Sequence, residues 1–141
     1  MANIGTHCIL ELYGCPRTLL NDREFVKNAV RDATEHGLAA LVGEVSHQFQ
    51  PHGVTALGLL AESHISIHTW PEHGYAAADV FTCGETANPQ RACVYLVRAF
   101  RAARHSLTKL VRGPEACVGG DADVPRLEVE PICAVTDAPV A

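Results

Sequence analysis

Apolar residues along the first 112 positions recur with two different spacings, and each spacing predicts a different kind of element. In six segments they alternate with polar residues or form short apolar runs, which is typical of strands. These segments are Thr6–Tyr13, Leu38–Phe49, Val54–Ala61, Glu62–Trp70, Tyr75–Thr82 and Ser106–Val111. Two other segments repeat apolar residues every three or four positions, which predicts helices. One follows a cap at Asn21 or Asp22 and stops at His36–Gly37, and the other opens at Asn88 with Pro89 in its first turn.

The order of these elements predicts the fold class. Strands outnumber helices, and turns rich in proline and glycine, such as residues 50–53 and 71–74, join successive strands as hairpins. We therefore predict an α+β fold, a two-layer α/β sandwich with a largely antiparallel sheet and two helices on one face. From Gly113 the composition changes, so we expect a single domain over residues 1–112 and a Pro/Gly-rich C-terminal tail over residues 113–141, with one added strand around Arg126–Val129.

Charge and cysteine content narrow the function classes. The 141 residues are 48% hydrophobic, which is enough for a buried core. Their net charge of −5 argues against a general binder of nucleic-acid backbones. No run approaches the ~20 apolar residues that a membrane span needs, and the N-terminus lacks the features of a signal peptide. The six cysteines include no Cys-x-x-Cys pair, so we expect free thiols in a cytoplasmic protein.

The segment Glu62–Glu72 is the densest polar run within an otherwise apolar stretch, and three interpretations are open. Its polar residues can simply face solvent on an edge strand. A metal site is disfavoured, because His64 and His68 on a strand lie ~13 Å apart and cannot share one ion. A hydrolase with Ser63 or Cys83 as nucleophile and His68 as base needs a strand–turn–helix elbow, which neither nucleophile has.

Several motifs in this region resemble the bacterial S-adenosylmethionine decarboxylase proenzymes, the short pyruvoyl-dependent type. The motifs are Glu62–His64, Ile67–Glu72, Gly74–Ala77 and Asp79–Gly84, with Gly5–His7, Glu11–Cys15 and His47–Val54 further out. The likeness extends over residues 4–113, and the tail beyond Gly113 matches nothing in the pattern. The combination is far more specific than any one motif.

The resemblance implies that the chain cuts itself between Glu62 and Ser63, giving a small chain of residues 1–62 and a larger one of residues 63–141. The Ser63 hydroxyl attacks the Glu62 carbonyl, the amide becomes an ester, and removal of the Ser63 α-proton eliminates the ester. Ser63 then becomes a covalent pyruvoyl cofactor. The resemblance assigns this processing to His68, assisted by a hydroxyl at position 55. This chain has Thr55 where the family commonly has serine, so we expect an altered rate rather than a lost reaction.

The resemblance also assigns the residues of the mature site. A pyruvoyl group forms a Schiff base with the substrate amine and takes up the electrons left when CO₂ departs. Cys83 is then the proton donor, because a thiol can donate and recover a proton near neutral pH. The expected substrate-binding residues are Phe49 against adenine, Glu72 on the ribose hydroxyls, and Trp70 and Glu11 as further walls. A sulfonium over an aromatic face gains about 0.5–2 kcal/mol.

The function implied is decarboxylation of S-adenosyl-L-methionine to the aminopropyl donor for spermidine synthesis. The resemblance also implies a homodimer with shared sites, in which Ser63 and Cys83 of one copy meet Phe49, Thr55, His68 and Glu72 of the other. No metal, nucleic acid or membrane is expected as a partner. A relative that decarboxylates arginine or ornithine remains an alternative, because it would keep the same processing residues. A non-enzymatic nucleoside-binding or interaction protein is the alternative of another class, and it would not need Ser63, His68 and Cys83 together.

Overall fold

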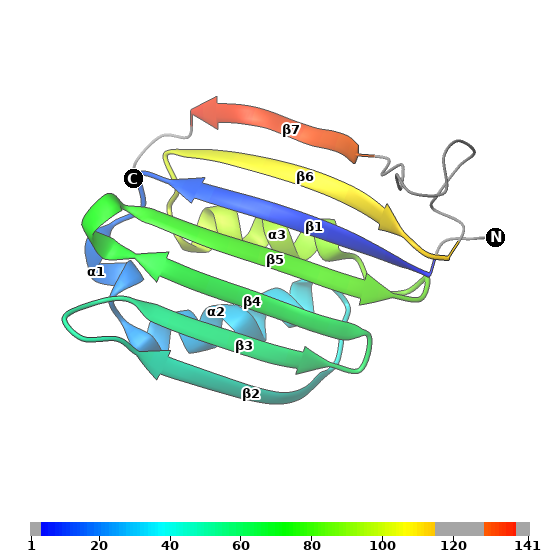
Figure 1. Ribbon diagram of the computed structural model, residues 1–141, viewed down its shortest axis with the longest axis horizontal. Coiled ribbons are helices and arrows are strands. Elements are labelled where there is room, and N and C mark those ends of the chain that lie inside the picture. The colour runs from blue at the N-terminus through cyan, green and yellow to red at the C-terminus, as the bar shows by residue number, and fades with distance from the viewer. Residues whose placement is uncertain (1–3, 115–128, 138–141) are drawn as a thin grey trace.

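The computed structural model describes residues 4–114 and 129–137, and these residues form one sheet with helices on one side (Figure 1). The elements in chain order are β1 (Gly5–Tyr13), α1 (Arg17–Leu20), α2 (Arg23–His36), β2 (Leu41–Gln48), β3 (Val54–Leu60), β4 (Ser63–Trp70), the 3₁₀ turn η1 (Pro71–His73), β5 (Tyr75–Cys83), α3 (Pro89–Ala99), β6 (Arg104–Arg112) and β7 (Val129–Asp137). The strand order is β2-β3-β4-β5-β1-β6-β7, and every neighbouring pair is antiparallel. The predicted α+β sandwich is confirmed.

The two long helices form where the capping chemistry predicts. The Asp22 carboxylate accepts from the Phe25 backbone N–H at 3.1 Å at the start of α2, and Asn88 caps α3 in the same way through Arg91. Both helices pack their apolar stripes against the sheet and bury one shared core; its largest fully buried side chains include Phe100, Leu10, Leu12, Leu20, Ile65 and Ile67. Figure 1 shows α2 and α3 behind the sheet, which leaves the other face uncovered by helices.

The alternation along β4 is confirmed, and it decides where the candidate site residues lie. Ile65, Ile67 and Thr69 are buried toward the helices, while His64, His68 and Trp70 are more exposed. The uncovered face of the sheet therefore carries the polar chemistry. None of the helices in the described ranges is long and apolar enough to cross a membrane.

Two features differ from the sequence prediction. The short helix α1 follows Pro16 and was not expected, because four residues carry no periodic signal. The added strand spans Val129–Asp137 and pairs with β6, so it begins where the expected strand around Arg126–Val129 ends. Part of the segment expected as a tail thus extends the sheet, because the edge of β6 offers hydrogen-bond partners that composition does not reveal. Residues 115–128 and 138–141 lie outside the described residues.

Candidate active site

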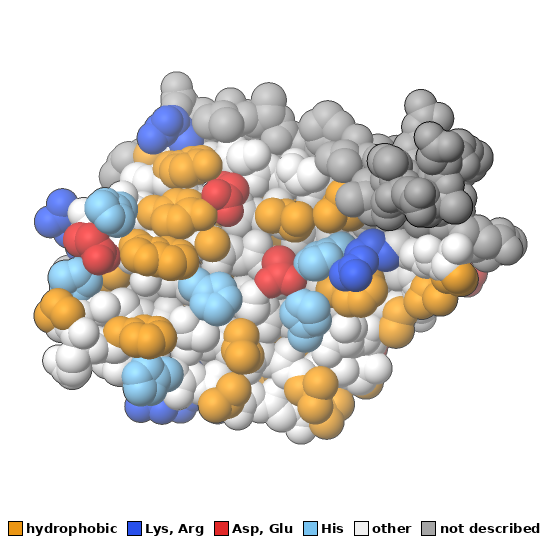
Figure 2. All heavy atoms as spheres, viewed as in Figure 1, with side chains coloured by type: hydrophobic (Ala, Val, Ile, Leu, Met, Phe, Trp, Pro, Cys, Tyr) orange, Lys and Arg blue, Asp and Glu red, His pale blue; other side chains and the backbone are white. Residues whose placement is uncertain are grey.

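The uncovered sheet face carries both apolar and titratable side chains. Exposed apolar residues on the strands and the hairpin of this face include Ile9, Val45, Phe49, Leu57, Leu59 and Trp70. Figure 2 shows histidine, acidic and basic side chains gathered among them, over β1, β4 and β5. Val45 on the edge strand β2 is 63% exposed and Leu59 on its neighbour β3 is 59% exposed. Apolar side chains that gather exposed on one face can mark an interaction surface.

The carbonyl before Ser63 receives two hydrogen bonds from a single residue. Cys83, at the end of β5, donates its backbone N–H and its thiol to the Glu62 carbonyl oxygen, each over 2.9 Å. The Glu62 side chain points elsewhere, since its Oε1 accepts from the Ala40 backbone N–H at 3.0 Å. Two donors on one carbonyl polarise it and stabilise the negative charge that nucleophilic attack would create there.

The backbone at Ser63 has a conformation that side chains rarely adopt. Its φ is 153°, a region populated almost only by glycine. Such strain costs on the order of 1–3 kcal/mol and persists only where the surroundings enforce it. Here the β3–β4 turn and the β4–β5 pairing hold Ser63 from both sides. The amide that precedes Ser63 is therefore polarised, and the serine that follows it is held in a strained backbone conformation.

A stability comparison tests this strain. We expect the free energy of unfolding of Ser63→Gly to be about 1 kcal/mol higher than that of Ser63→Ala. Relief of backbone strain at position 63 should outweigh the extra entropy that glycine gives to the unfolded chain. Neither variant has a hydroxyl, so self-cleavage does not complicate the comparison. Urea unfolding measures the difference, with Ser106→Gly and Ser106→Ala as the matched pair at a strand residue whose φ is not positive. Equal stability of the two Ser63 variants would remove the strain argument.

A cluster of His7, His64 and Asp79 lies beside Ser63, and the sequence analysis missed it. The Nε2 atoms of His7 and His64 lie 2.7 and 2.8 Å from the same oxygen, Asp79 Oδ2, and the Ser66 hydroxyl donates to Asp79 Oδ1. Burial alone would raise the pKa of Asp79, but these hydrogen bonds outweigh it and hold the pKa below its usual value. An aspartate among the apolar residues of Tyr75–Thr82 is the signal that could have drawn attention to it.

The ligand atoms of this cluster lie within 4.8 Å of one another, which raises the question of a metal ion. Arg112 Nη1 lies 3.2 Å from His7 Nδ1, and a guanidinium can only donate. The neutral ring of His7 therefore keeps its lone pair on Nδ1 and its hydrogen on Nε2, where a metal would have to bind. A nearby guanidinium charge also repels a cation. The cluster fits a hydrogen-bond network better than a metal site.

The other expected catalytic residues lie toward the opposite end of β4. Thr55 Oγ1 and His68 Nδ1 are 2.9 Å apart on neighbouring strands. The Tyr75 hydroxyl donates to Glu11 at 2.7 Å, and burial together with this carboxylate raises the pKa of Tyr75. The Trp70 and Tyr75 rings lie 5.3 Å apart between centroids, which builds an aromatic surface beside Glu11.

Phe49 and Glu72 flank this aromatic surface from two turns. Phe49 precedes the β2–β3 turn and meets the His47 ring edge-on at 4.6 Å. Glu72 lies in η1, 3.0 Å from His52 Nε2. Its pKa is lowered by a hydrogen bond from its own backbone and by His52. A pocket of about 340 Å³ beside it is lined by Arg17, Thr18, Asn21, His52, Pro71 and Glu72.

These two groups of residues do not meet within one chain. Ser63 and His68 are five residues apart on a regular strand, so their Cα atoms are separated by ~16 Å at ~3.3 Å per residue. Cys83 accompanies Ser63, whereas Thr55 accompanies His68. The same separation argues against a hydrolase in which His68 activates Ser63 or Cys83 of its own chain.

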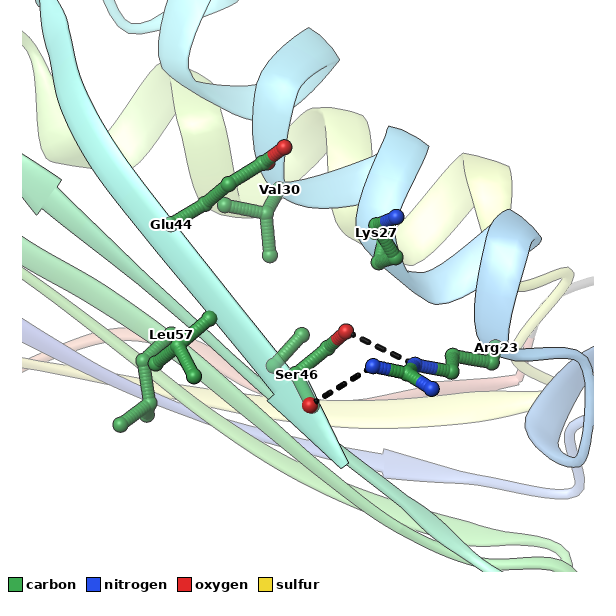
Figure 3. Close-up of a pocket in the computed structure, with 8 residues that line it drawn as sticks. Arg23, Lys27, Val30, Glu44, Ser46 and Leu57 are labelled. Carbon is green, nitrogen blue, oxygen red and sulfur yellow. Dashed lines mark hydrogen bonds between the residues drawn. The ribbon is translucent and has the colours of Figure 1, made fainter. Parts of the chain in front are cut away.

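A second pocket lies away from the expected catalytic residues, between α2 and the edge strand β2, and Val45 and Leu57 contribute to its lining (Figure 3). It has a volume of about 290 Å³, and Arg23 closes one side of it by donating to the hydroxyl and the carbonyl of Ser46, each at 3.0 Å. Glu44 faces the same space and pairs with Arg31. The charged groups here thus have partners of their own.

Comparisons with known proteins connect this geometry to a family. Residues 6–113 match the family model described as S-adenosylmethionine decarboxylase. The chain is 50% identical over 115 residues to the S-adenosylmethionine decarboxylase proenzyme of Parasynechococcus marenigrum, covering 82% of this chain and 90% of the relative. It is 43% identical over 113 residues to the proenzyme of Thermodesulfovibrio yellowstonii, covering 80% and 84%. The crystal structure of the adenosylmethionine decarboxylase from Aquifex aeolicus superposes with a TM-score of 0.75 at 35% identity, covering 86% of this chain and 97% of that one.

Proposed function

The chain belongs to the S-adenosylmethionine decarboxylase family, and we propose that it is a proenzyme that cleaves itself at Glu62–Ser63 and then decarboxylates S-adenosylmethionine. The product would be S-adenosylmethioninamine, the aminopropyl donor for spermidine synthesis. The reaction makes the protein a carboxy-lyase. Its free cysteines in the described part of the chain, Cys8, Cys15, Cys83 and Cys93, suit a cytoplasmic enzyme.

The observation that carries this proposal is the pair of Cys83 donors on the Glu62 carbonyl. An ordinary β-turn carbonyl needs neither a thiol donor nor a strained serine after it. Attack by the Ser63 hydroxyl would place negative charge on this oxygen, and both donors already point at it. Removing one such donor typically slows a reaction about 10²–10³-fold.

The residues around Ser63 fit the pyruvoyl group that cleavage would create. That group would supply the electron sink for the decarboxylation. Ser63 is the first residue of β4, so cleavage leaves it at a chain end held by β5, with the Cys83 thiol on the preceding carbonyl. Once Glu62 has separated, this thiol is free to donate a proton to the substrate carbon, which is the role we assign to it.

A complete site requires two copies of the chain. Ser63 lies ~16 Å along β4 from His68, which is too far for proton transfer. Cys83 on β5 contacts the Glu62 carbonyl beside Ser63, and Thr55 on β3 contacts His68. A two-fold axis on the uncovered sheet face would lay one end of β4 over the opposite end of the partner's β4, and it would cover the exposed apolar residues there. We therefore propose a homodimer in which Ser63 and Cys83 of one protomer work with the Thr55 and His68 of the other.

The substrate surface favours a nucleoside over a simple amino acid. Phe49 and Trp70 offer exposed aromatic faces for adenine and for the sulfonium charge, Glu72 offers a carboxylate for ribose hydroxyls, and Glu11 is held in place by Tyr75. Arginine or ornithine could pair with the carboxylates, but neither has a planar base to stack on the aromatic faces or ribose hydroxyls to bind Glu72. A binding protein without catalysis would in turn have no use for the contacts between Cys83 and the Glu62 carbonyl.

One experiment tests this choice. Purified cleaved protein is offered carboxyl-labelled S-adenosylmethionine, arginine and ornithine in parallel, and released CO₂ is counted. We expect release from S-adenosylmethionine and at least 100-fold less from the other two. If CO₂ is released mainly from arginine or ornithine, the assigned substrate is wrong. If fully cleaved protein releases CO₂ from none of the three compounds, the proposed activity is overturned.

A further prediction separates cleavage from turnover. His68→Ala should stop after the amide has become an ester, because the α-proton of Ser63 then lacks its base; hydroxylamine should split that ester into two chains. Cys83→Ala should cleave more slowly, since it keeps only the backbone donor, and should lose most decarboxylation after cleavage. Intact mass spectrometry and CO₂ release measure the two steps. Identical defects in both variants would show that these roles are wrongly assigned.

A further inference from the structure

We propose that His64 takes the proton from the Ser63 hydroxyl during self-cleavage, and that Asp79 and His7 position its ring for this step. The inference rests on the proposed self-cleavage. It assigns a base to the first of the two proton transfers, since His68 is assigned to the second. Nothing in the sequence analysis singled out His64, Asp79 or His7 for this role.

The positions of the His64 ring nitrogens support this assignment. Nε2 lies 2.8 Å from Asp79 Oδ2, and a carboxylate only accepts, so this nitrogen carries hydrogen. In the neutral ring the lone pair is therefore on Nδ1, and Nδ1 lies 3.4 Å from Ser63 Oγ. The hydroxyl donates toward a nitrogen that can accept its proton. The order serine, histidine, aspartate is the arrangement in which a histidine activates a hydroxyl nucleophile.

The groups packed around His64 keep the ring in this state. Asp79 on β5 faces it directly, and His7 on β1 and Ser66 on β4 share that carboxylate. Arg112 on β6 reaches the cluster through His7 Nδ1. Phe81 packs against both histidine rings, with centroids 5.2 Å from His7 and 6.0 Å from His64. On the β3 side the residue opposite His64 is Leu59, which brings no charge.

His68 cannot perform this step from its own chain, and the chemistry calls for two different protons. The first proton leaves Ser63 Oγ as the hydroxyl attacks, and the second leaves the Ser63 α-carbon during elimination. The two protons leave different atoms at different stages of the reaction. A base from the same strand, adjacent to Ser63, suits the first transfer, and a base from the partner copy suits the second.

The step balances without any added reagent. A bond forms between Ser63 Oγ and the carbonyl carbon of Glu62 as the hydroxyl proton passes to His64 Nδ1. The Glu62 carbonyl oxygen takes the negative charge, where the two Cys83 donors stabilise it. The Glu62 carbon–nitrogen bond then breaks, and the proton held by His64 passes to the departing Ser63 nitrogen. The result is an ester with a free amine, and His64 is neutral again.

The test uses hydroxylamine to show which step has stopped. In His64→Gln we expect cleavage to slow at least 100-fold, the lower end of a general-base contribution. The His64→Gln protein should accumulate with its Glu62–Ser63 amide intact, so hydroxylamine should leave it as one chain. The His68→Ala protein should accumulate as the ester, which hydroxylamine should split into two chains. His36→Gln, at the far end of α2, is the matched control and should cleave as the wild type does. Near-ultraviolet circular dichroism checks that each variant is folded.

Two further variants keep the proposal testable if His64→Gln is unstable. His64→Ala should regain cleavage with added imidazole, which can replace a base but not a structural side chain. Asp79→Asn should also accumulate the hydroxylamine-resistant amide, because it no longer fixes the ring's hydrogen on Nε2. The proposal is overturned if either His64 variant cleaves within about threefold of wild type or accumulates a hydroxylamine-sensitive ester. It is also overturned if His64→Ala gains nothing from imidazole. Wild-type protein that never cleaves would instead overturn the proposed function itself.

Discussion

Ser63→Ala protein should stay a single chain of 141 residues, while wild-type protein should separate into chains of residues 1–62 and 63–141. Alanine keeps the fold around the Glu62 carbonyl but has no oxygen to attack it, so the loss of cleavage should be complete rather than partial. Decarboxylation should disappear with it, because no pyruvoyl group forms.

Intact mass and N-terminal sequencing measure this result. The larger wild-type chain should resist sequencing, since its first residue carries a ketone in place of an amine. Ser106→Ala, which removes a hydroxyl from β6, is the control and should cleave normally. Wild-type protein that remains uncut after long incubation, or a larger chain that begins with a free serine, would contradict the pyruvoyl mechanism.

The sequence predicts much of this fold because its signals are local. Caps at Asp22 and Asn88 and the alternation along β4 depend on neighbouring residues alone, and the structure confirms each of them. The strand β7 was predicted only at its first residue. Its pairing depends on the edge of β6, which is distant in sequence and leaves no periodic mark in a segment rich in proline and acids.

The candidate site was less predictable because it depends on strand register. The β4–β5 pairing sets Ser66 opposite Asp79, and the β1–β5 pairing sets His7 opposite Phe81. A shift of one residue in the register of β5 would turn Asp79 toward the helices, away from His7 and His64. The same register brings Cys83 to the Glu62 carbonyl. The family resemblance named Ser63, His68 and Cys83 and implied that His68 comes from the other copy, and the register of the folded sheet supplies a physical reason for that division.

That separation makes a sharp prediction about mixed dimers. Ser63→Ala and His68→Ala proteins should each be inactive alone. In a dimer that contains one of each, one site combines the intact Ser63 of the His68→Ala chain with the intact His68 of its partner. The other site carries both substitutions. Co-expressed chains should therefore regain cleavage, with activity approaching half of the wild-type value per mixed dimer.

The identity of the cleaved chain makes this test stringent. Only the His68→Ala chain has a Ser63 to cleave, so every larger fragment should carry the mass of the His68→Ala substitution.

Ser63→Ala mixed with Cys83→Ala is the matched control. Both residues belong to the same half of the site, so no mixed dimer contains a complete site. Decarboxylation should therefore stay near zero. Two differently tagged chains, purified through both tags, ensure that only mixed dimers are assayed. If verified Ser63→Ala/His68→Ala dimers neither cleave nor release CO₂, each site must lie within one chain, and the ~16 Å between Ser63 and His68 would have to close by a rearrangement of β4 itself.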